Sequence, residues 1–410
     1  MILRSLHLQS YRGFASQTFP FSHRVTVIAG INGRGKSSIL DATALLLSNL
    51  LPKVTPAIGG YKYLSEEDIK IGAERLEIGI QASFEAIPVD FSISKDRTSR
   101  QIPTTILRQV REEILRIYGD PTDATDSAPI AVYYTTDRAS FRLPKRLLSI
   151  LRVNQAAAYR GALVNRQIDY RDFMSRFKVW KNSRAANDQA TIALIEQVVG
   201  QFLTGFSEIE IQEGPLRLTV RKGDDVLDLT QLSDGERSTL AILMDLCRRL
   251  SLANPGLEDP AQGKGVVLID EIELHLHPKW QREIVDKFRE AFPNLQFIFT
   301  THSPFVIQSL RSEEELILLD GQTISSFANK SINEVSQGIM GVANPQVSIR
   351  YEAMRDAAKH YLEILEETKM DPAQKLEAYK QRLSEAIDVF AENPAYQAFL
   401  EMKRAGALGE

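Results

Sequence analysis

The sequence has a single cysteine and no long apolar run, and each of these absences excludes a class of protein. Because Cys247 is the only cysteine among 410 residues, neither an intrachain disulfide nor a cysteine-based zinc site can form. No apolar run approaches the roughly 18–20 residues needed to cross a bilayer. The opening stretch MILRSLHLQSYRGF is interrupted by Arg4 and His7, which does not fit a secretory signal peptide. We therefore expect a cytoplasmic protein with no membrane partner.

The net charge is small, at −4, but the charged residues are unevenly distributed. The segment from Arg142 to Arg184 holds eleven Lys or Arg and two acids, so it carries +9 and the rest of the chain −13. The aromatic residues spread among these charges are Tyr159, Tyr170, Phe173, Phe177 and Trp180. Basic residues contact phosphates and aromatic rings stack on bases, which predicts a surface for DNA or structured RNA. The alternative is a solvated helical arm whose aromatic side chains form its own core.

Apolar periodicity predicts strands that alternate with helices, as in a mainly parallel sheet covered on both faces. In the first part of the chain we expect strands at 2–9, 17–29, 75–84, 87–94 and 129–136, helices at 36–51 and 101–118, a mostly helical stretch at 143–204 and a hairpin within 208–229. In the second part we expect helices at 235–252, 278–291 and 304–311 and the strands GVVLID, QFIFTTH and ELILLD.

The segment GINGRGKS, Gly30 to Ser37, fits the pattern G-x-x-x-x-G-K-[ST] between a strand and a helix. Its glycines let backbone N–H groups converge on phosphates, aided by the positive end of the following helix. Lys36 would neutralise the β- and γ-phosphates and Ser37 would ligate Mg²⁺. The residues that we assign to nucleotide binding here are Gly30, Asn32, Gly33, Arg34, Gly35, Lys36, Ser37 and Ser38.

Two further strands end in polar residues. The strand VVLIDE places Asp270 and Glu271 at the carboxyl edge of a sheet, where open α/β sheets bind ligands. We expect Asp270 to hold the magnesium ion and Glu271 to act as general base on the attacking water. The strand FIFTT delivers His302 to the same edge, where we expect it to sense the γ-phosphate and contribute to catalysis.

The segment ELHLHP carries His275 and His277 at a spacing that also suits a metal ion. The sequence supplies no obvious third ligand, and Pro278 begins a helix directly afterwards. We instead expect this segment to lie at a subunit boundary near the carboxylates.

Together GINGRGKS, LSDGE, VLIDEIELHLHP and TTHSPF resemble the ABC-type ATPases of the SMC, Rad50 and RecF group. The opening LHLQSYRGF is similar to that group's first strand and Arg-Gly-Phe turn, so the resemblance adds Arg12 to the nucleotide-binding residues. It covers about residues 1–60 and 205–320. Within the group, the short chain and the segment DEIELHLHP resemble stand-alone ATPases of bacterial anti-phage defence, such as the Septu-type ATPase that works with an HNH nuclease and also occurs with retrons.

The resemblance implies that LSDGE is the signature segment, which contacts the γ-phosphate of ATP bound to the opposite protomer. Ser233, Gly235 and Glu236 would then complete the partner's site, and the following helix would direct its dipole at the phosphate. The usual form in the family is LSGGQ, so Asp234 and Glu236 add negative charge, which implies slow turnover. Locally, Ser233 and Glu236 also fit a helix-capping box, and both roles can hold at once.

The fold class that these patterns indicate is α/β: an ABC-type P-loop NTPase head with a mainly parallel sheet and an antiparallel subdomain, a helical insertion and a C-terminal helical region. We assign 1–100 to the first lobe with the P-loop, 101–205 to a basic, mostly helical insertion, 206–325 to the lobe with the signature, Asp270, Glu271 and His302, and 326–410 to the C-terminal region. The glutamine loop of ABC heads cannot be located, although residues after PIAVYYTTDR are candidates. The insertion is too short for a long coiled coil, and no nuclease motif is apparent.

The function implied is an ATPase that forms a homodimer or higher homo-oligomer around two ATP, with Mg²⁺, and acts as the switch of a defence complex. Its partners would be an HNH nuclease and nucleic acid, either DNA or retron RNA/DNA. One alternative is an ATP-gated DNA-binding clamp, like the RecF repair protein, with structural ATP and little turnover. Another is the nucleotide-binding subunit of a transporter, which the long basic insertion disfavours.

Residues 351–405 show three apolar stripes at helical spacing. The stripes comprise Met354, Ala358, Tyr361 and Leu365; Leu376, Tyr379, Leu383, Ile387 and Phe390; and Tyr396, Phe399 and Leu400. Three short helices are too few for a large independent core. They would therefore pack on the ATPase body, on a second protomer or on the partner nuclease.

Overall fold

The computed structural model describes residues 1–319 with short gaps, and a few residues beyond. The gaps are 56, 58, 59, 105, 119–126, 140–143, 149–153, 165 and 166, and the described residues after 319 are Glu334, Val335, Lys359, Glu363 and Met402. The chain divides into two compact units, Met1–Gly341 and Val342–Glu410. The stripe residues predicted within 351–405 lie outside the described residues.

The centre of the first unit is a parallel sheet of order β13-β3-β12-β11-β7. Its strands are β3 (Val25–Ala29), β7 (Ile130–Tyr134), β11 (Gly265–Ile269), β12 (Leu295–Thr301) and β13 (Leu316–Leu318). The four longer strands are entirely buried, as expected of a parallel sheet covered on both faces. Strand β7 lies inside the range that we assigned to the insertion, so that range contributes an edge strand to the central sheet.

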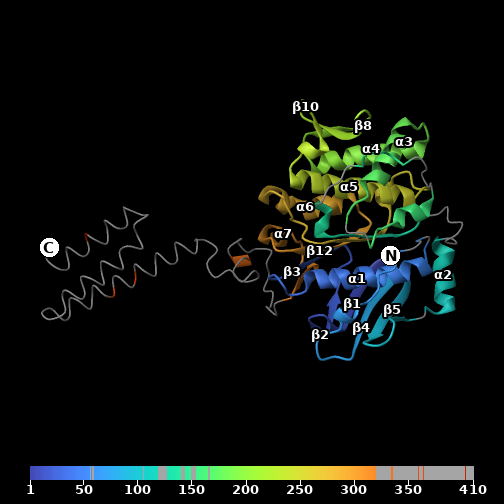
Figure 1. Ribbon diagram of the computed structural model, residues 1–410, viewed down its shortest axis with the longest axis vertical. Helices are drawn as coiled ribbons and strands as arrows, with labels where there is room; N and C mark the ends of the chain where they lie inside the picture. The colour runs from blue at the N-terminus through green and yellow to red at the C-terminus, as the bar shows by residue number, and fades with distance from the viewer. Residues whose placement is uncertain are drawn as a thin grey trace. The chain divides into compact units, whose positions relative to one another are not determined.

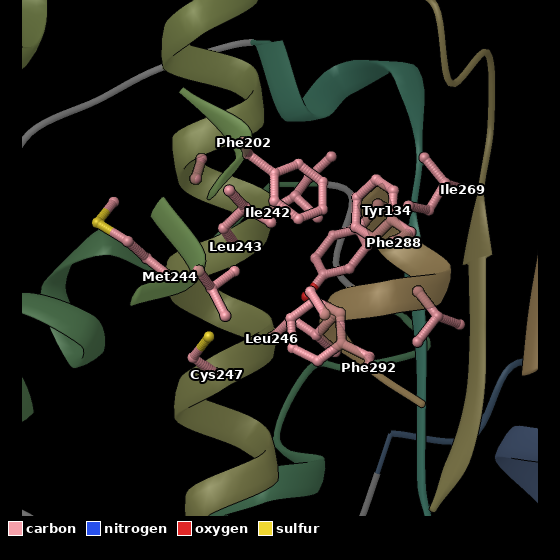
Figure 2. Packing of buried hydrophobic residues seen from close by; sticks show 14 of the residues in the cluster. Tyr134, Phe202, Ile242, Leu243, Met244, Leu246, Cys247, Ile269, Phe288 and Phe292 are labelled. Carbon is pink, nitrogen blue, oxygen red and sulfur yellow. The ribbon is translucent and has the colours of Figure 1, made fainter. Parts of the chain in front are cut away.

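Successive residues of these strands point to opposite faces, and each face has its own core. Along β11, Val267 and Ile269 join one hydrophobic cluster while Val266 and Leu268 join the other. The first cluster lies beneath α4 (Ala186–Phe202), α5 (Asp234–Ala253) and α6 (Pro278–Ala291). Figure 2 shows side chains of α5 facing Phe202, Phe288 of α6 and Phe292 directly after that helix, next to Tyr134 and Ile269 of the sheet. The Phe202 and Phe288 rings pack edge to face, with their centroids 4.8 Å apart.

The second cluster contains α1 (Lys36–Leu50), which lies between the central sheet and an antiparallel sheet (Figure 1). That sheet has the order β2-β1-β4-β5-β6, with β1 (Ile2–Tyr11), β2 (Phe14–Pro20), β4 (Arg75–Phe84), β5 (Ile87–Asp96) and β6 (Ile102–Pro103). A buried glutamine ties the two sheets together: Gln296 on β12 accepts from Leu3 N at 2.7 Å and donates to the Leu3 carbonyl at 2.8 Å. The partner is β1 at its bulge, where ladder hydrogen bonds are interrupted.

The remaining elements comprise α2 (Arg108–Tyr118), α3 (Tyr170–Asn182), α7 (Pro304–Gln308) and a small antiparallel sheet of β8 (Phe206–Gln212), β9 (Arg217–Lys222) and β10 (Asp225–Asp228). The mixed α/β architecture, with one parallel and two antiparallel sheets in the described residues, confirms the predicted fold class. Two element predictions were wrong in detail. The strand expected at 17–29 is split into β2 and β3, and the helix expected from 101 begins only at Arg108, because Pro103 pairs with Ile93 in β6.

Candidate nucleotide site

The segment GINGRGKS forms a loop between β3 and α1, at the carboxyl edge of the central sheet. Gly33 and Gly35 have φ values of 82° and 96°, in the left-handed region that favours glycine. A Cβ on Gly35 would lie 2.7 Å from the Phe14 ring, so the Arg-Gly-Phe turn packs directly beneath the loop. Gly35 is also the N-cap of α1 and gives it no side-chain cap. A helix start of this kind presents backbone N–H groups to an anion.

The side chains of the loop differ in exposure. Asn32, Arg34 and Ser37 are exposed, whereas Ser38 is half-buried and Lys36 is buried. The Lys36 ammonium donates to the carbonyl groups of Gly30 at 2.8 Å and Ile31 at 3.1 Å, which places its charge inside the loop.

Ser37 and Asp270 lie together although they are far apart in the sequence. Strand β11 ends at Ile269, and Asp270 follows it beside the start of α1, so that Ser37 Oγ donates to Asp270 Oδ1 at 3.2 Å. Thr300 on β12 donates to the same carboxylate oxygen at 2.5 Å. A hydroxyl and a carboxylate are oxygen ligands of the kind that Mg²⁺ prefers. The donor set therefore fits the magnesium ion that the sequence predicts.

Glu271 comes next, with its backbone in the left-handed region at φ 47°. Its N–H donates to Thr300 Oγ1 at 2.7 Å, and its carbonyl accepts from Arg138 Nη2 at 2.7 Å. Arg138 Nη1 donates to the Asp270 carbonyl at 2.5 Å. Burial lowers the pKa of Arg138 to about 10, against the opposing effect of Asp270, Glu273 and Glu271. Hydrogen bonds with Arg138 on one side and Thr300 on the other thus hold the backbone of Asp270 and Glu271.

His302 lies at the end of β12, the strand between β3 and β11. Its Nδ1 is 3.4 Å from Lys36 Nζ. Burial lowers the pKa of the imidazole and Lys36 lowers it further, against the opposing effect of Glu271 and Asp270, which favours the neutral form of the ring. Glu273 accepts from the His302 N–H and, at 2.8 Å, from Thr301 Oγ1. Burial raises the pKa of the Glu273 carboxyl against the opposing effect of these hydrogen bonds.

Arg12 reaches α1 from the turn after β1. Its guanidinium donates to Asp68 at 2.9 Å, to Asp41 at 2.8 Å and to Ser38 Oγ at 3.2 Å. It therefore lies beside the first turns of the helix that follows the phosphate loop.

The signature residues Ser233, Gly235 and Glu236 begin helix α5. Ser233 and Glu236 form a reciprocal capping box, with the serine hydroxyl 2.9 Å from the carboxylate. Burial raises the pKa of Glu236, but hydrogen bonds from Lys222 and Ser233 outweigh it, so the pKa lies below its usual value. Lys222 Nζ is 2.6 Å from Glu236, and Asp234 pairs with Arg237. Both acids that depart from the family pattern thus have a cationic partner within this chain.

Gly235 packs against the segment that follows Glu271. A Cβ on Gly235 would lie 2.3 Å from the His275 carbonyl oxygen, so only glycine allows this contact. His275 itself has φ 63°, and the His277 ring accepts from Lys279 N at 3.3 Å as the N-cap of α6. The two histidines therefore shape a turn between the signature helix and α6.

The aromatic residues of the basic segment do not face solvent, contrary to the expected stacking surface. Tyr159, Tyr170, Phe173, Phe177 and Trp180 are all buried. Arg176 is buried as well, at 3% exposure, and pairs with Asp172. Arg142, Arg152 and Arg166 lie outside the described residues. The rings are therefore core residues, as the alternative interpretation expects, but they belong to the cluster shared with the central sheet and α5 and not to a separate core of a helical arm.

Sequence reasoning missed three residues that surround the site: Arg138, Thr300 and Glu273. A polar residue inside an apolar strand was a usable signal for Thr300, since a completely buried hydroxyl needs a hydrogen-bond partner. Arg138 lies in η3 (Thr136–Ala139), directly after β7, in the stretch that we considered for the glutamine loop. Its contacts arise only from the pairing of β7 with β11.

With this geometry established, comparison with known proteins places the chain in a family. Residues 25–308, from β3 to α7, match the family described as "AAA domain, putative AbiEii toxin, Type IV TA system". The chain belongs to this family. Proteins similar over most of the chain include the "Retron Ec83 probable ATPase" of Escherichia coli. It is 28% identical over a region that covers 81% of this chain and 76% of the length of the relative.

Two more relatives support the same assignment. The "Retron Vc95 probable ATPase" of Vibrio cholerae serotype O1 biovar El Tor is 28% identical over 77% of this chain and 73% of its own. The Septu protein PtuA of Bacillus thuringiensis is 22% identical over 92% of this chain and 93% of its own. These similarities confirm the resemblance to ATPases of the SMC, Rad50 and RecF type that belong to defence systems.

Solved structures with a similar chain path include an SMC head bound to the C-winged helix domain of ScpA and the recombination mediator RecF-ATPrS. The SMC head is 18% identical, with 77% of this chain and 92% of that chain covered and a TM-score of 0.45. The RecF structure is 14% identical, with 77% and 96% covered and a TM-score of 0.42. Within the described residues, no helix combines the length and apolar character needed to span a bilayer.

Proposed function

We propose that this protein binds Mg²⁺-ATP at the carboxyl edge of the central sheet and hydrolyses it. The observation that carries the proposal is the convergence of Lys36, Ser37, Asp270, Glu271 and His302 from the ends of three adjacent strands, β3, β11 and β12. Ligands bind in this position in open α/β sheets. Backbone N–H groups at the start of α1 and the Lys36 ammonium would hold the phosphates.

Each side chain has a distinct role in this proposal. Ser37 and Asp270 would hold the magnesium ion, which, when bound, neutralises charge that develops on the phosphate oxygens. Glu271 would orient the attacking water and accept its proton. The neutral His302 ring would hydrogen-bond to the γ-phosphate without adding a second positive charge beside Lys36.

The proposal includes a head-to-tail homodimer or a higher homo-oligomer. The N-terminus of α5, with Ser233 and Gly235, would contact the ATP held by a second protomer and complete that site. Because Glu236 and Asp234 are each paired with a cation of their own chain, their added charge need not prevent an approach to phosphate.

We further propose that the ATPase acts as the switch of an anti-phage defence complex. Similarity to ATPases of retron and Septu systems supports this role. The partners would be an HNH nuclease, and DNA or retron RNA/DNA, in the cytoplasm. The domain boundaries expected from the sequence, with 326–410 docking the nuclease, are part of this proposal.

The deciding experiment compares Glu271→Gln with Lys36→Ala in the full-length chain. Removal of a positioned general base costs about 10²–10⁴-fold in rate, so Glu271→Gln should retain bound ATP unhydrolysed, whereas Lys36→Ala should fail to bind it. Glu258→Gln, which changes an exposed loop carboxylate, is the matched control. Wild-type turnover in Glu271→Gln would overturn the assignment of the base. Very low turnover in the wild type, equal to that of Glu271→Gln, would favour an ATP-gated clamp.

A further inference from the structure

Arg138 has a buried guanidinium whose hydrogen bonds within the described residues all go to backbone carbonyl oxygens. The residue is 2% exposed, and its two Nη atoms donate to the carbonyl groups of Thr135, Asp270 and Glu271 at 3.0, 2.5 and 2.7 Å. Its Nε is buried without a hydrogen-bond partner among the described residues. A buried donor without an acceptor costs free energy. Stability alone therefore does not explain an arginine here.

The carbonyl groups that Arg138 holds include those of the two residues whose carboxylates carry the proposed chemistry. Glu271 has a left-handed backbone, which a residue with a Cβ adopts at a cost unless its surroundings fix it. Thr300 binds the Glu271 N–H on one side, and Arg138 binds the carbonyl on the other. These bonds determine the direction in which the Glu271 side chain leaves the backbone.

Arg138 also lies beside the signature helix. The short helix η3 packs against α5, and Arg138 lines a small cavity together with Ser238 and Thr239 of that helix. Gly235, one turn earlier on α5, packs against the His275 carbonyl four residues after Glu271. The segment that carries the general base is thus in contact with α5 and with η3.

We propose that Arg138 is a positioning residue that holds Glu271 in place for hydrolysis. The inference rests on the proposed role of Glu271 as general base. In this role Arg138 acts through the backbone at 270–271, whose carbonyl groups it binds, and not through the nucleotide itself. Removal of the Arg138 side chain should therefore slow the chemical step. ATP binding should remain almost unchanged, because the Arg138 guanidinium makes no hydrogen bond to Lys36 or to the rest of the phosphate loop.

The test compares Arg138→Met, which keeps an unbranched apolar stem but loses the donors, with Arg138→Lys, which keeps one charged donor. Loss of a supporting hydrogen bond at an active site typically costs about 10–100-fold in rate. We expect a fall in kcat of this size for Arg138→Met with little change in KM or in ATP affinity, and partial recovery for Arg138→Lys. Arg116→Met, at an exposed arginine on α2, is the control and should match the wild type.

The double variant Arg138→Met/Glu271→Gln separates positioning from a general loss of structure. If Arg138 acts only through Glu271, the double variant should be no slower than Glu271→Gln alone, since effects of residues that act as a unit are not additive. An additional loss equal to that seen in the wild-type background, or wild-type kcat in Arg138→Met, overturns the inference. If Arg138→Met does not fold, Arg138→Lys carries the same comparison. Wild-type turnover in Glu271→Gln instead overturns the assignment of Glu271 as general base, on which this inference rests.

Discussion

The hydroxyl of Tyr134 donates a 3.0 Å hydrogen bond to Asp245 Oδ2 in the interior of the protein, and so joins edge strand β7 to helix α5. Burial raises the pKa of Asp245, but the positive charges of Arg249 and Arg248 outweigh this effect and hold the pKa of the carboxyl well below its usual range. Arg248 also donates to Asp172 at 2.8 Å, and Asp172 binds Arg176 at the same distance. A chain of buried ion pairs thus runs from the central sheet to α3.

Arg176→Glu should strongly destabilise the protein. The substitution removes one of the two cationic partners of Asp172, leaving Arg248, and adds a second buried negative charge beside the carboxylate. Breaking a buried ion pair by removing one partner costs about 3–5 kcal/mol. Arg171→Glu, on the exposed face of the same helix, is the control and should change the free energy of unfolding little. Urea denaturation measures both, and equal stabilities would contradict the buried network.

Nucleic-acid binding, if it uses this segment, should depend on its exposed cations. Arg171, Lys181 and Arg184 are exposed, whereas Arg176 is not. Reversing these three to Glu should weaken affinity for DNA or RNA and reduce its salt dependence, because each phosphate contact releases about one counterion. The pair Arg108→Glu and Arg116→Glu on α2 controls for net charge. Unchanged affinity and an unchanged salt slope would remove this surface from the binding site.

Subunit complementation tests the composite site. A Lys36→Ala chain lacks the ammonium of the phosphate loop, and a Ser233→Arg chain carries a bulky residue at the start of α5. If one protomer's α5 completes the other's site, a mixed dimer has one intact site and one doubly defective site. ATP turnover should then recover on mixing, relative to either variant alone. Absence of recovery in dimers shown to have exchanged subunits would argue against the head-to-tail arrangement.

The pH dependence of stability should report on His302 in the absence of nucleotide. Its folded-state pKa is lowered by burial and by Lys36, so the unfolded chain takes up the proton first as pH falls through the usual value near 6.5. As pH falls, stability is therefore lost between the unfolded pKa and the lower folded pKa of His302. At still lower pH no further stability is lost through this group. His302→Gln lacks this titration, so the wild type should lose more thermal stability than the variant between about pH 7.5 and 5. A constant difference in Tm across this range would contradict the lowered pKa.

The sequence predicts the parts of the site that are encoded locally. The phosphate loop needs only β3, three glycines and α1 in succession, and Asp270, Glu271 and His302 each come directly after an apolar strand. Arg138 could not be found in this way, because its contacts with 270 and 271 depend on β7 pairing with β11 across more than a hundred residues. Neither could the burial of Arg176, because its ion-pair chain includes Asp245 and Arg248 on a different helix. A charge count cannot separate a solvated cation from one neutralised in the core.

Helix α1 begins at Gly35 without a side chain to cap it, whereas Ser233 caps α5 and Ser303 caps α7. A bound phosphate would therefore complete the helix as well as occupy the site, and occupancy would be coupled to folding. At a ligand concentration one hundred times its Kd, such coupling contributes about 2.7 kcal/mol to stability. In a cell, the concentration of nucleotide would then influence the fraction of the protein that is folded. Variants that cannot bind ATP would be cleared faster by proteases, so their abundance, as well as their activity, would fall.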